Sequence, residues 1–345
     1  MEQEHKRRVR YKGTHPRSYR EKYKELNPEK YQADVEKIVQ SGKTPAGMHI
    51  PIMVEEILDV LQIQPGQTGY DATLGYGGHT RRMLEALQGQ GHLYATDVDP
   101  IESEKTRKRL ADLGYGPDIL TIRRMNFAQS DQVAPGVQFD FVLADLGVSS
   151  MQIDNPQRGF TFKFDGPLDL RLDPSSGVSA AQRLRELDQE ELTALLVENA
   201  DEPYAAAIAK AVRKVFKSGG AIETTKQLAA VIESALSFLP QAERREAVKK
   251  SCQRTFQALR IDVNSEFEVL YSFLEKLPDI LKSGGRAAVL TFHSGEDRLV
   301  KQAFRQYQRQ GIFSEVAQDV IRPSAQECFQ NPRARSTKLR WAIRG

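Results

Sequence analysis

The sequence has little cysteine and no long apolar run, and both absences narrow the classes to which this 345-residue chain can belong. Its two cysteines, Cys252 and Cys328, are too few for a disulfide framework and lack a CxxC spacing, which predicts inert packing residues and no metal site. No apolar stretch approaches the ~18–20 residues of a membrane helix. The polar start of the chain also lacks the apolar segment of a signal peptide. We therefore expect a cytoplasmic protein with no membrane partner.

Several catalytic signatures are missing as well. The chain has no complete Walker-type loop, since Gly42-Lys43-Thr44 lacks the required glycine at position 37, and it has no apparent Ser-His-Asp or Cys-His arrangement. With 40% hydrophobic and 28% charged residues, its composition is that of an ordinary globular protein, which excludes wholesale disorder and fibrous folds.

Basic charge is concentrated at the two ends of the chain. Residues 1–48 hold 12 lysines and arginines against 7 acidic residues, and residues 331–345 hold five basic residues and no acidic one. Four tyrosines interleave with the basic residues of the first segment: Tyr11, Tyr19, Tyr23 and Tyr31. Such a combination can stack on bases while pairing with phosphates, which favours a nucleic-acid partner. A helical arm packed on the body through its tyrosines, or a solvated charged face, is the alternative.

From Met48 onward, helical and strand-like patterns alternate. Helical spacing covers Ile52–Leu61, Thr80–Leu87 and Glu102–Leu113, and apolar strand-like runs cover Thr68–Leu74, His92–Asp97, Ile119–Arg123 and Phe139–Asp145. This alternation predicts an α/β fold with a doubly wound parallel sheet. The alternation of helices and strands stops after Asp145 and resumes only with a helix at Ser265–Leu281 and a strand at Arg286–Phe292.

The segment between these two alternating parts is rich in Ala, Leu, Glu, Lys and Arg at helical spacing. We therefore expect four segments: a basic extension (1–48), the first part of the sheet domain (49–173), an inserted all-helical domain (174–255) and the second part of the sheet domain (256–345).

A glycine-rich loop follows the first predicted strand and opens a helix; it contains Gly75, Gly77, Gly78 and His79. Glycines let the backbone approach a ligand closely, and a helix N-terminus supplies free N–H donors. Asp97 ends the next strand, where its carboxylate can accept hydrogen bonds from both hydroxyls of a ribose. Together these features favour a ribose-bearing cofactor over a simple tight turn.

Asp71, at the start of this loop, narrows the type of cofactor. A carboxylate there would repel a pyrophosphate but suits S-adenosylmethionine, which carries an ammonium and a sulfonium. The alternative is a hydrogen-bond acceptor that stabilises the loop.

Asp145 ends the fourth predicted strand, and ligands of open α/β sheets bind outside the carboxyl ends of the strands. An exocyclic amine on a base is a poor nucleophile because its lone pair is delocalised, so an acceptor that orients it would assist its reaction. Asp145 is our candidate for that role, and a structural cap on the strand end is the alternative.

Three further groups of residues have two interpretations each. Phe160, Phe162 and Phe164 alternate in a way that could wall a base pocket, although such a stripe is more often core. Asp165, Asp169 and Asp173 are spaced by four, but the interleaved Arg158 and Arg171 favour salt bridges over a metal site.

His293 follows the last predicted strand and could act as a base or orient the substrate. Ser294 and Asp297 resemble a helix capping box, so the turn has an architectural interpretation of equal weight.

The ordered strings HIPIMVEEIL, DATLGYGGHT, DVDP, DLGVSSMQIDNPQRGFTFKFDGPLDLRLD, RTFQALRIDVNSE, GGRAAVLTFHSGEDRLVK and NPRARSTKLRWAIR resemble the RsmH (MraW) family. Its members are bacterial S-adenosylmethionine-dependent methyltransferases that modify N4 of a cytosine in the decoding region of small-subunit (16S) ribosomal RNA. The resemblance runs from about His49 to Arg344.

It implies a class I, Rossmann-like methyltransferase core with an inserted helical domain, and small-subunit rRNA or the assembled 30S subunit as partner. It also implies cofactor contacts from the following residues: Gly77, Gly78, His79, Asp97, Phe127, Asp145 and Gln152. Arg254 and Gln257 should line the RNA-facing cleft.

Three departures from the family pattern keep other functions open. The segment before Met48 is additional, Lys250-Ser-Cys-Gln253 replaces a usual HPAT, and both Gly295 and Ala200–Pro203 differ from the usual residues. A paralogue acting on an amino group of another RNA or of DNA is one alternative. A non-catalytic RNA-binding assembly factor is the second, and a Rossmann dehydrogenase fits the loop least well.

Overall fold

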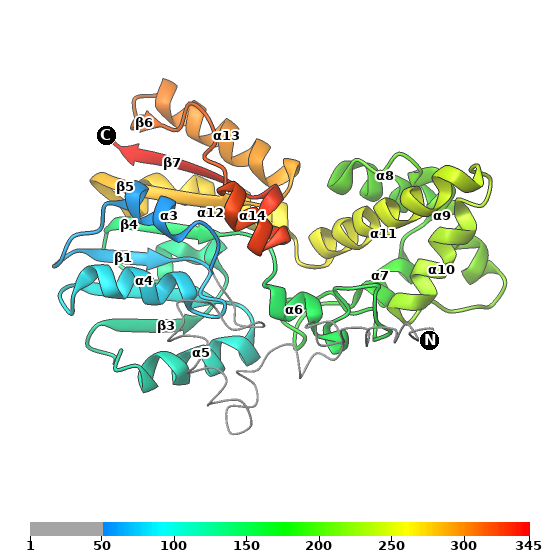
Figure 1. The fold of residues 1–345 in the computed structure, drawn as a ribbon, viewed down its shortest axis with the longest axis horizontal. Coiled ribbons are helices and arrows are strands. Elements are labelled where there is room, and N and C mark those ends of the chain that lie inside the picture. Colours follow the sequence, from blue (N-terminus) through cyan, green and yellow to red (C-terminus); the bar gives the residue numbers. More distant parts are fainter. Residues whose placement is uncertain (1–50) are drawn as a thin grey trace, which may run out of the picture. The chain divides into compact units, whose positions relative to one another are not determined.

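The structure is a computed structural model that describes residues 51–345, so the predicted basic extension and its four tyrosines lie outside the described residues. Seven strands form one sheet in the order β3-β2-β1-β4-β5-β7-β6 (Figure 1). Their bounds are β1 Thr68–Asp71, β2 His92–Asp97, β3 Leu120–Arg124, β4 Phe139–Asp145, β5 Leu281–Thr291, β6 Phe313–Val316 and β7 Lys338–Arg344. Strands β1 to β5 pair in parallel, and the predicted α/β class is confirmed.

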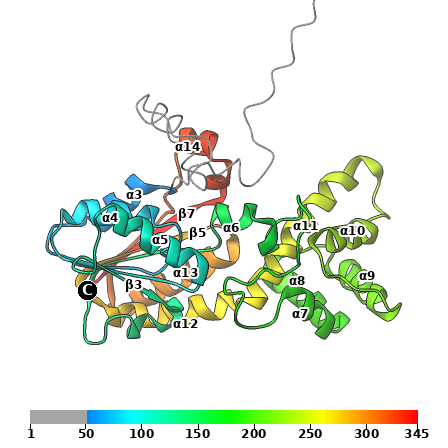
Figure 2. The ribbon, with the colours of Figure 1, turned by 90° about the horizontal axis from the view of Figure 1, so that it is seen from below.

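Helices cover both faces of this sheet (Figures 1 and 2). Along β4, Phe141 and Leu143 enter one hydrophobic cluster while Val142 and Ala144 enter the other, as the two-residue period of a strand requires. The first cluster includes side chains of α3 (Val54–Leu61), α4 (Gly78–Leu87) and α5 (Pro100–Asp112), and the second those of α12 (Glu266–Ile280) and α13 (Ser294–Arg309). A sheet covered in this way exposes ligand-binding side chains mainly at its strand ends.

The C-terminal strands β6 and β7 were not predicted. Strand β7 runs antiparallel between β5 and β6, and its basic side chains are used by the fold. Lys338 and Arg340 both contact Asp297 at 2.7 Å, and Arg344 donates to the carbonyl oxygens of Pro278 and Ile312. These contacts favour a structural use of the three basic residues, and the polyanion-binding end stays a prediction.

A third hydrophobic cluster, with members from Leu168 to Leu259, belongs to the helical region. It is built mainly from α7 Ala180–Glu186, α8 Gln189–Ala200, α9 Ala205–Lys217, α10 Thr225–Ala235 and α11 Gln241–Val263. Ser179, Asp188 and Thr224 begin three of these helices with capping boxes. Helix α11 continues through the predicted boundary at residues 255 and 256, and the four-segment division stays a prediction.

The short elements α6 (Ser150–Asp154), η2 (Phe127–Gln132), η3 (Pro156–Arg158), α14 (Ala325–Gln330) and η4 (Pro332–Ser336) complete the described fold. Within residues 51–345, no helix has both the length and the apolar character to cross a bilayer.

Candidate functional site

Three aspartates end three neighbouring strands of the sheet. Asp71 ends β1, Asp97 ends β2 and Asp145 ends β4, and β1 pairs in parallel with both of the other strands. Because parallel strands end at the same edge, the fold gathers these carboxylates there. We call Asp71, Asp97, Asp145 and His79 the carboxylate edge.

Asp71 is bound to its own loop. It is 1% exposed, and its carboxylate accepts hydrogen bonds from the Thr80 hydroxyl at 2.6 Å and from the Thr73 amide at 3.1 Å. Burial raises the pKa of Asp71 despite these two bonds. Both carboxylate oxygens hold the loop to α4, which supports the loop-stabilising interpretation of Asp71.

Asp97 accepts two backbone hydrogen bonds at the end of β2. The Gly75 amide donates to Oδ2 and the Asp99 amide donates to Oδ1, both at 2.8 Å. Burial raises the pKa of Asp97 to about 6, and the neighbouring Asp99 and Asp71 act in the same direction. Each carboxylate oxygen has a second lone pair, so the group can still accept the two hydroxyls of a ribose.

Asp145 has one oxygen facing a histidine and one without a partner among the described residues. Oδ2 lies 3.4 Å from His79 Nδ1, and the Asp145 amide donates to the Thr73 hydroxyl at 2.7 Å. Oδ1 is buried and accepts no hydrogen bond from residues 51–345. A buried unpartnered acceptor is costly, so this atom indicates a place where an N–H of a bound reactant belongs.

The N-terminus of α4 completes this side of the edge. Gly77 precedes the helix with a φ of 80°, and no side chain caps the helix. A Cβ at Gly77 would lie 2.7 Å from Thr106 Cγ2. The turn therefore requires glycine both for its backbone conformation and for its packing. The uncapped N–H groups of the first turn can bind a carboxylate such as that of a bound amino acid.

Asp99 is a functional neighbour that the sequence analysis missed. It is fully buried, its Oδ1 caps α5, and its Oδ2 accepts from Gln152 at 2.9 Å and from Arg158 at 2.6 Å. Arg158 also donates to the carbonyls of Arg171 and Leu172. The second Asp of DVDP, placed before Pro100 as a helix cap, was the available signal. Gln152 therefore reaches the carboxylate edge through Asp99.

The predicted aromatic residues divide between two hydrophobic clusters. Phe127 packs edge-on against Phe273 with ring centroids 5.3 Å apart. Phe160 and Phe162 pack on the core of the helical region, where Phe162 meets Phe256, while Phe164 is 46% exposed. These contacts favour the core interpretation for Phe160 and Phe162.

Two of the three aspartates spaced by four make salt bridges, while Asp165 accepts the backbone amides of Gly166 and Lys226. Asp169 contacts Arg171 at 2.7 Å, and this pairing lowers the pKa of Asp169 against the effect of burial. Asp173 contacts Arg124 at 2.8 Å, and hydrogen bonds from Ser175 and Arg124 lower the pKa of Asp173 against the effect of burial. The salt-bridge interpretation therefore holds for these two residues, although Asp173 pairs with an arginine that was not predicted.

The turn after β5 differs from the predicted capping box. Helix α13 begins at Ser294 itself, so His293 is the residue before the helix and no side chain caps it from that position. Instead, Glu296 Oε2 accepts the Phe292 amide at 2.7 Å. His293 Nε2 lies 3.1 Å from Glu296 Oε1, without hydrogen-bond geometry at either ring nitrogen.

Arg260 and Glu266 join this turn to the end of α11. The Arg260 guanidinium donates to both oxygens of Glu266 at 2.8 Å, and both groups are largely buried. We call Arg260, Glu266, His293 and Glu296 the turn cluster. Ligand atoms of Glu266, His293 and Glu296 lie within 4.8 Å of one another, as a metal site would require. Arg260 already supplies a positive charge to these carboxylates, so they do not need a metal ion to balance their charge.

In the turn cluster the pKa of Glu296 is lowered. Burial alone would raise it, but His293, Arg260 and the Phe292 amide stabilise the carboxylate more strongly. The catalytic role of His293 stays a prediction.

Two departures from the family pattern meet in the helical region. The Ser251 hydroxyl donates to Glu202 Oε1 at 2.8 Å, and both residues are buried. Segments 200–203 and 250–253 are therefore in direct contact. Arg254, one residue beyond, is partly exposed, and Gln257 donates weakly to the Asn199 carbonyl at 3.4 Å.

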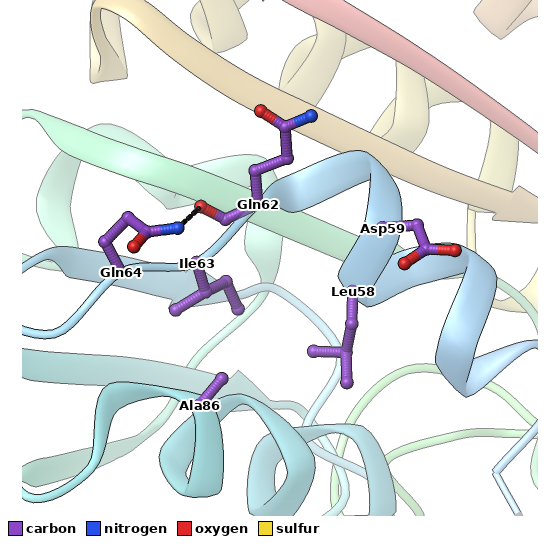
Figure 3. A pocket seen from close by; sticks show the side chains of 6 residues that line it. All are labelled: Leu58, Asp59, Gln62, Ile63, Gln64 and Ala86. Carbon is purple, nitrogen blue, oxygen red and sulfur yellow. Dashed lines mark hydrogen bonds between the residues drawn. The ribbon is translucent and has the colours of Figure 1, made fainter.

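A surface pocket of about 360 Å³ lies away from this site (Figure 3). It is lined by Leu58, Asp59, Gln62, Ile63, Gln64 and Ala86. The C-terminal ends of α3 and α4, which lead into β1 and β2, form it, so it belongs to the amino edge of the strands. Ligands of this class of sheet bind at the opposite edge.

Comparison with known proteins matches residues 46–344 to the MraW methylase family. "Ribosomal RNA small subunit methyltransferase H 1" of Agathobacter rectalis is 64% identical over 344 residues, 99% of each chain. The protein of that name from Lachnoclostridium phytofermentans is 65% identical over 341 residues, 99% of this chain and 93% of its own.

"Ribosomal RNA small subunit methyltransferase H" of Thioalkalivibrio sulfidiphilus is 38% identical over 323 residues, 88% of this chain and 99% of its own. Residues 1–45 thus lie outside the family model but within the match to the two more similar relatives. The matches confirm the resemblance seen in the sequence: the chain belongs to the MraW methylase family.

Proposed function

We propose that the chain transfers a methyl group from S-adenosylmethionine to the exocyclic N4 amine of a cytosine in small-subunit (16S) ribosomal RNA. Methylation of small-subunit rRNA is the activity named for relatives that cover nearly the whole chain. The more specific assignment, to N4 of a cytosine, comes from the motif resemblance. The observation that carries the proposal is the buried Oδ1 of Asp145, which has no partner among residues 51–345 and lies at the same sheet edge as Asp97 and the glycine loop.

The carboxylate edge fits the proposed cofactor. Asp97 would accept the ribose hydroxyls, the uncapped N-terminus of α4 would bind the carboxylate of the methionine part, and Phe127 would lie beside the adenine. When bound, S-adenosylmethionine supplies a methyl group made electrophilic by its sulfonium. Asp71, already used by Thr80 and Thr73, adds negative potential without direct contact.

Asp145 acts on the substrate amine. Its Oδ1 accepts an N–H of the amine, which turns the nitrogen lone pair toward the methyl group and stabilises the positive charge that develops on nitrogen. One side-chain oxygen of Asp145 is held by His79 and the other is free, so the acceptor has a fixed direction. No metal or covalent enzyme intermediate is part of this proposal.

Substrate recognition belongs to the helical region in this proposal. The cytosine must leave its stack to enter the site, as RNA bases read by proteins commonly do. Arg254 and Gln257 on α11 are the residues we assign to the RNA, together with Phe160 and Phe162, whose packing limits them to partial contact. The proposed partner is small-subunit rRNA or the assembled 30S subunit.

Transfer of a labelled methyl group to small ribosomal subunits from a strain lacking the protein tests the proposal. The modified nucleotide is mapped by mass spectrometry. Label on a decoding-region cytosine N4 is expected. Label on another RNA or on DNA would favour a paralogue with a different substrate, an interpretation motivated by the altered segments 200–203 and 250–253. Folded protein that binds no S-adenosylmethionine would point to a non-catalytic assembly factor.

A further inference from the structure

The two ring nitrogens of His79 face different kinds of acceptor. Nε2 lies 2.9 Å from the Ile52 carbonyl oxygen, and Nδ1 lies 3.4 Å from Asp145 Oδ2. A carbonyl oxygen can only accept, so Nε2 must carry a hydrogen. The tautomer of His79 is therefore fixed by Ile52 before Asp145 is considered.

The remaining nitrogen, Nδ1, then has to carry a hydrogen as well. In a neutral ring protonated at Nε2, the lone pair of Nδ1 would point at a carboxylate oxygen, and two acceptors would repel each other. A proton between them turns the contact into an imidazolium–carboxylate pair. The carboxylates that act on the ring are Asp145 from β4 and Asp71 from β1, while the described residues before α3, 51–53, contribute the Ile52 carbonyl.

The environment of the ring agrees with that charge. His79 is 8% exposed, and burial by itself would lower its pKa. The hydrogen bond and charge of Asp145, with Asp71 behind it, more than offset this effect, and the pKa of His79 is raised.

We propose that His79 is a positioning residue: its imidazolium holds Asp145 Oδ2 so that only Oδ1 is presented to the reacting amine. The inference rests on the proposed function for the role of Oδ1, and on geometry alone for the charge state of the pair. The Thr73 hydroxyl fixes the backbone of Asp145 from the other side. The chain's own contacts thus set the direction of the acceptor.

Nitrogen-15 NMR of the imidazole rings in the full chain without ligand tests the charge state directly. We expect both nitrogens of His79 to be protonated at pH 7 in the wild type. In Asp145→Asn we expect the neutral ring, with a hydrogen on Nε2 and none on Nδ1. His92→Gln is the matched control. His92 begins β2, at the opposite end of that strand from Asp97, and its ring bonds the Asp118 carbonyl and the Thr121 hydroxyl. A neutral His79 with a bare Nδ1 at pH 7 would overturn the inference.

The rate of methyl transfer as a function of pH tests the positioning role. His79→Leu should lower kcat by about 100-fold, the cost of a misplaced group, with a much smaller change in the KM for S-adenosylmethionine. His79→Gln, which keeps a donor, should recover part of that loss. Because the pKa is raised, the imidazolium exists below the folded-state pKa and is lost as the pH rises through it. The wild type should therefore lose activity on that alkaline side, and His79→Gln should not.

The outcomes separate the two proposals. A wild type that transfers no methyl group to small subunits contradicts the proposed function, while the NMR result still reports on the His79–Asp145 pair. An active wild type whose alkaline limb persists unchanged in His79→Gln contradicts the positioning role alone.

Discussion

The carboxylate edge and the turn cluster are built from similar residues but differ in how their charge is balanced. Each contains a histidine and at least two buried or half-buried carboxylates. In the carboxylate edge the carboxylates end strands, and in the turn cluster they lie in the first turns of α12 and α13. In the turn cluster, Arg260 binds both oxygens of Glu266, and Glu296 accepts a backbone amide. In the carboxylate edge no arginine or lysine contacts Asp71, Asp97 or Asp145 among the described residues, and Asp145 Oδ1 has no partner there.

This difference separates a ligand site from a structural joint. Buried carboxylates whose charge is balanced within the protein stabilise a particular arrangement, whereas a buried carboxylate oxygen left without a partner is completed by something that binds. The contrast concerns the carboxylates, because both ring nitrogens of His293 in the turn cluster also lack hydrogen-bond partners among residues 51–345. The edge therefore suits a ligand that brings positive charge, and the turn cluster joins α11 to the β5–α13 turn. Variants in the edge should change binding and rate, while variants in the turn cluster should change stability.

Asp145→Asn is expected to have the largest effect. It keeps the shape of the side chain but removes the charged acceptor, so methyl transfer should fall by about 10²- to 10⁴-fold, the usual contribution of such a group. Transfer to small subunits measures the rate. Asp140→Asn, on the same strand and paired with Lys282 at the other end, is the matched control and should remain active. Comparable activity in both variants would remove Asp145 from the mechanism.

Glu296→Gln should mainly lower stability. Removing one member of a buried charged group costs about 3–5 kcal/mol in the free energy of unfolding, measured by denaturant titration. The pKa of Glu296 is lowered from 4.5, so the stabilisation is full above pH 4.5 and is lost as the pH falls through the folded-state value. The difference between wild type and variant should shrink over that range. A large loss of cofactor affinity in a stable Glu296→Gln would break the contrast.

Asp97→Asn should weaken S-adenosylmethionine binding by about 10- to 100-fold, since charged hydrogen bonds contribute ~1.5–3 kcal/mol. Calorimetry gives the affinity, and Asp112→Asn on exposed α5 is the control. Because the pKa of Asp97 is about 6, wild-type affinity should fall as the pH drops through 6 and the carboxylate is protonated. An affinity that is independent of pH between 5 and 7.5 would argue against a ribose contact at Asp97.

Arg254→Ala should have the smallest effect. Removing one arginine–phosphate interaction on α11 should weaken RNA binding by a few-fold and reduce the slope of log affinity against log salt by about 1. Filter binding at several salt concentrations provides the measurement, with exposed Arg309→Ala on α13 as control. Equal slopes in the two variants would indicate that the RNA does not contact Arg254.

Much of the sheet domain was predictable because its signals are local. Strands β2 and β4 have the predicted bounds, and the aspartates that end β1, β2 and β4 could be placed at one edge from the parallel topology alone. Strand β7 was missed because its basic residues mask the apolar alternation of Leu339 and Trp341. The charges of Lys338 and Arg340 are balanced by Asp297, which lies 41 and 43 residues earlier in the chain, so no local pattern reveals the pairing.

The candidate site was less predictable than the fold. The glycine loop, Asp97 and Asp145 follow from spacing, but the fourfold hydrogen bonding of Asp99 depends on Gln152 and Arg158, more than 50 residues further along the chain. The Ser294 capping box failed because His293, in extended conformation, precedes a helix that already includes Ser294. The charge balance that distinguishes the two regions also depends on tertiary contacts, such as that between Arg260 and Glu266.

The most direct test is a crystal structure of the chain with S-adenosylhomocysteine, the product left when the methyl group has been transferred. We expect the ribose hydroxyls within hydrogen-bond distance of Asp97, the amino-acid part beside α4 and Asp145, and an unchanged Arg260–Glu266 pair. A ligand bound at the turn cluster or in the pocket beside Leu58, with Asp97 and Asp145 untouched, would show that the carboxylate edge is not the cofactor site.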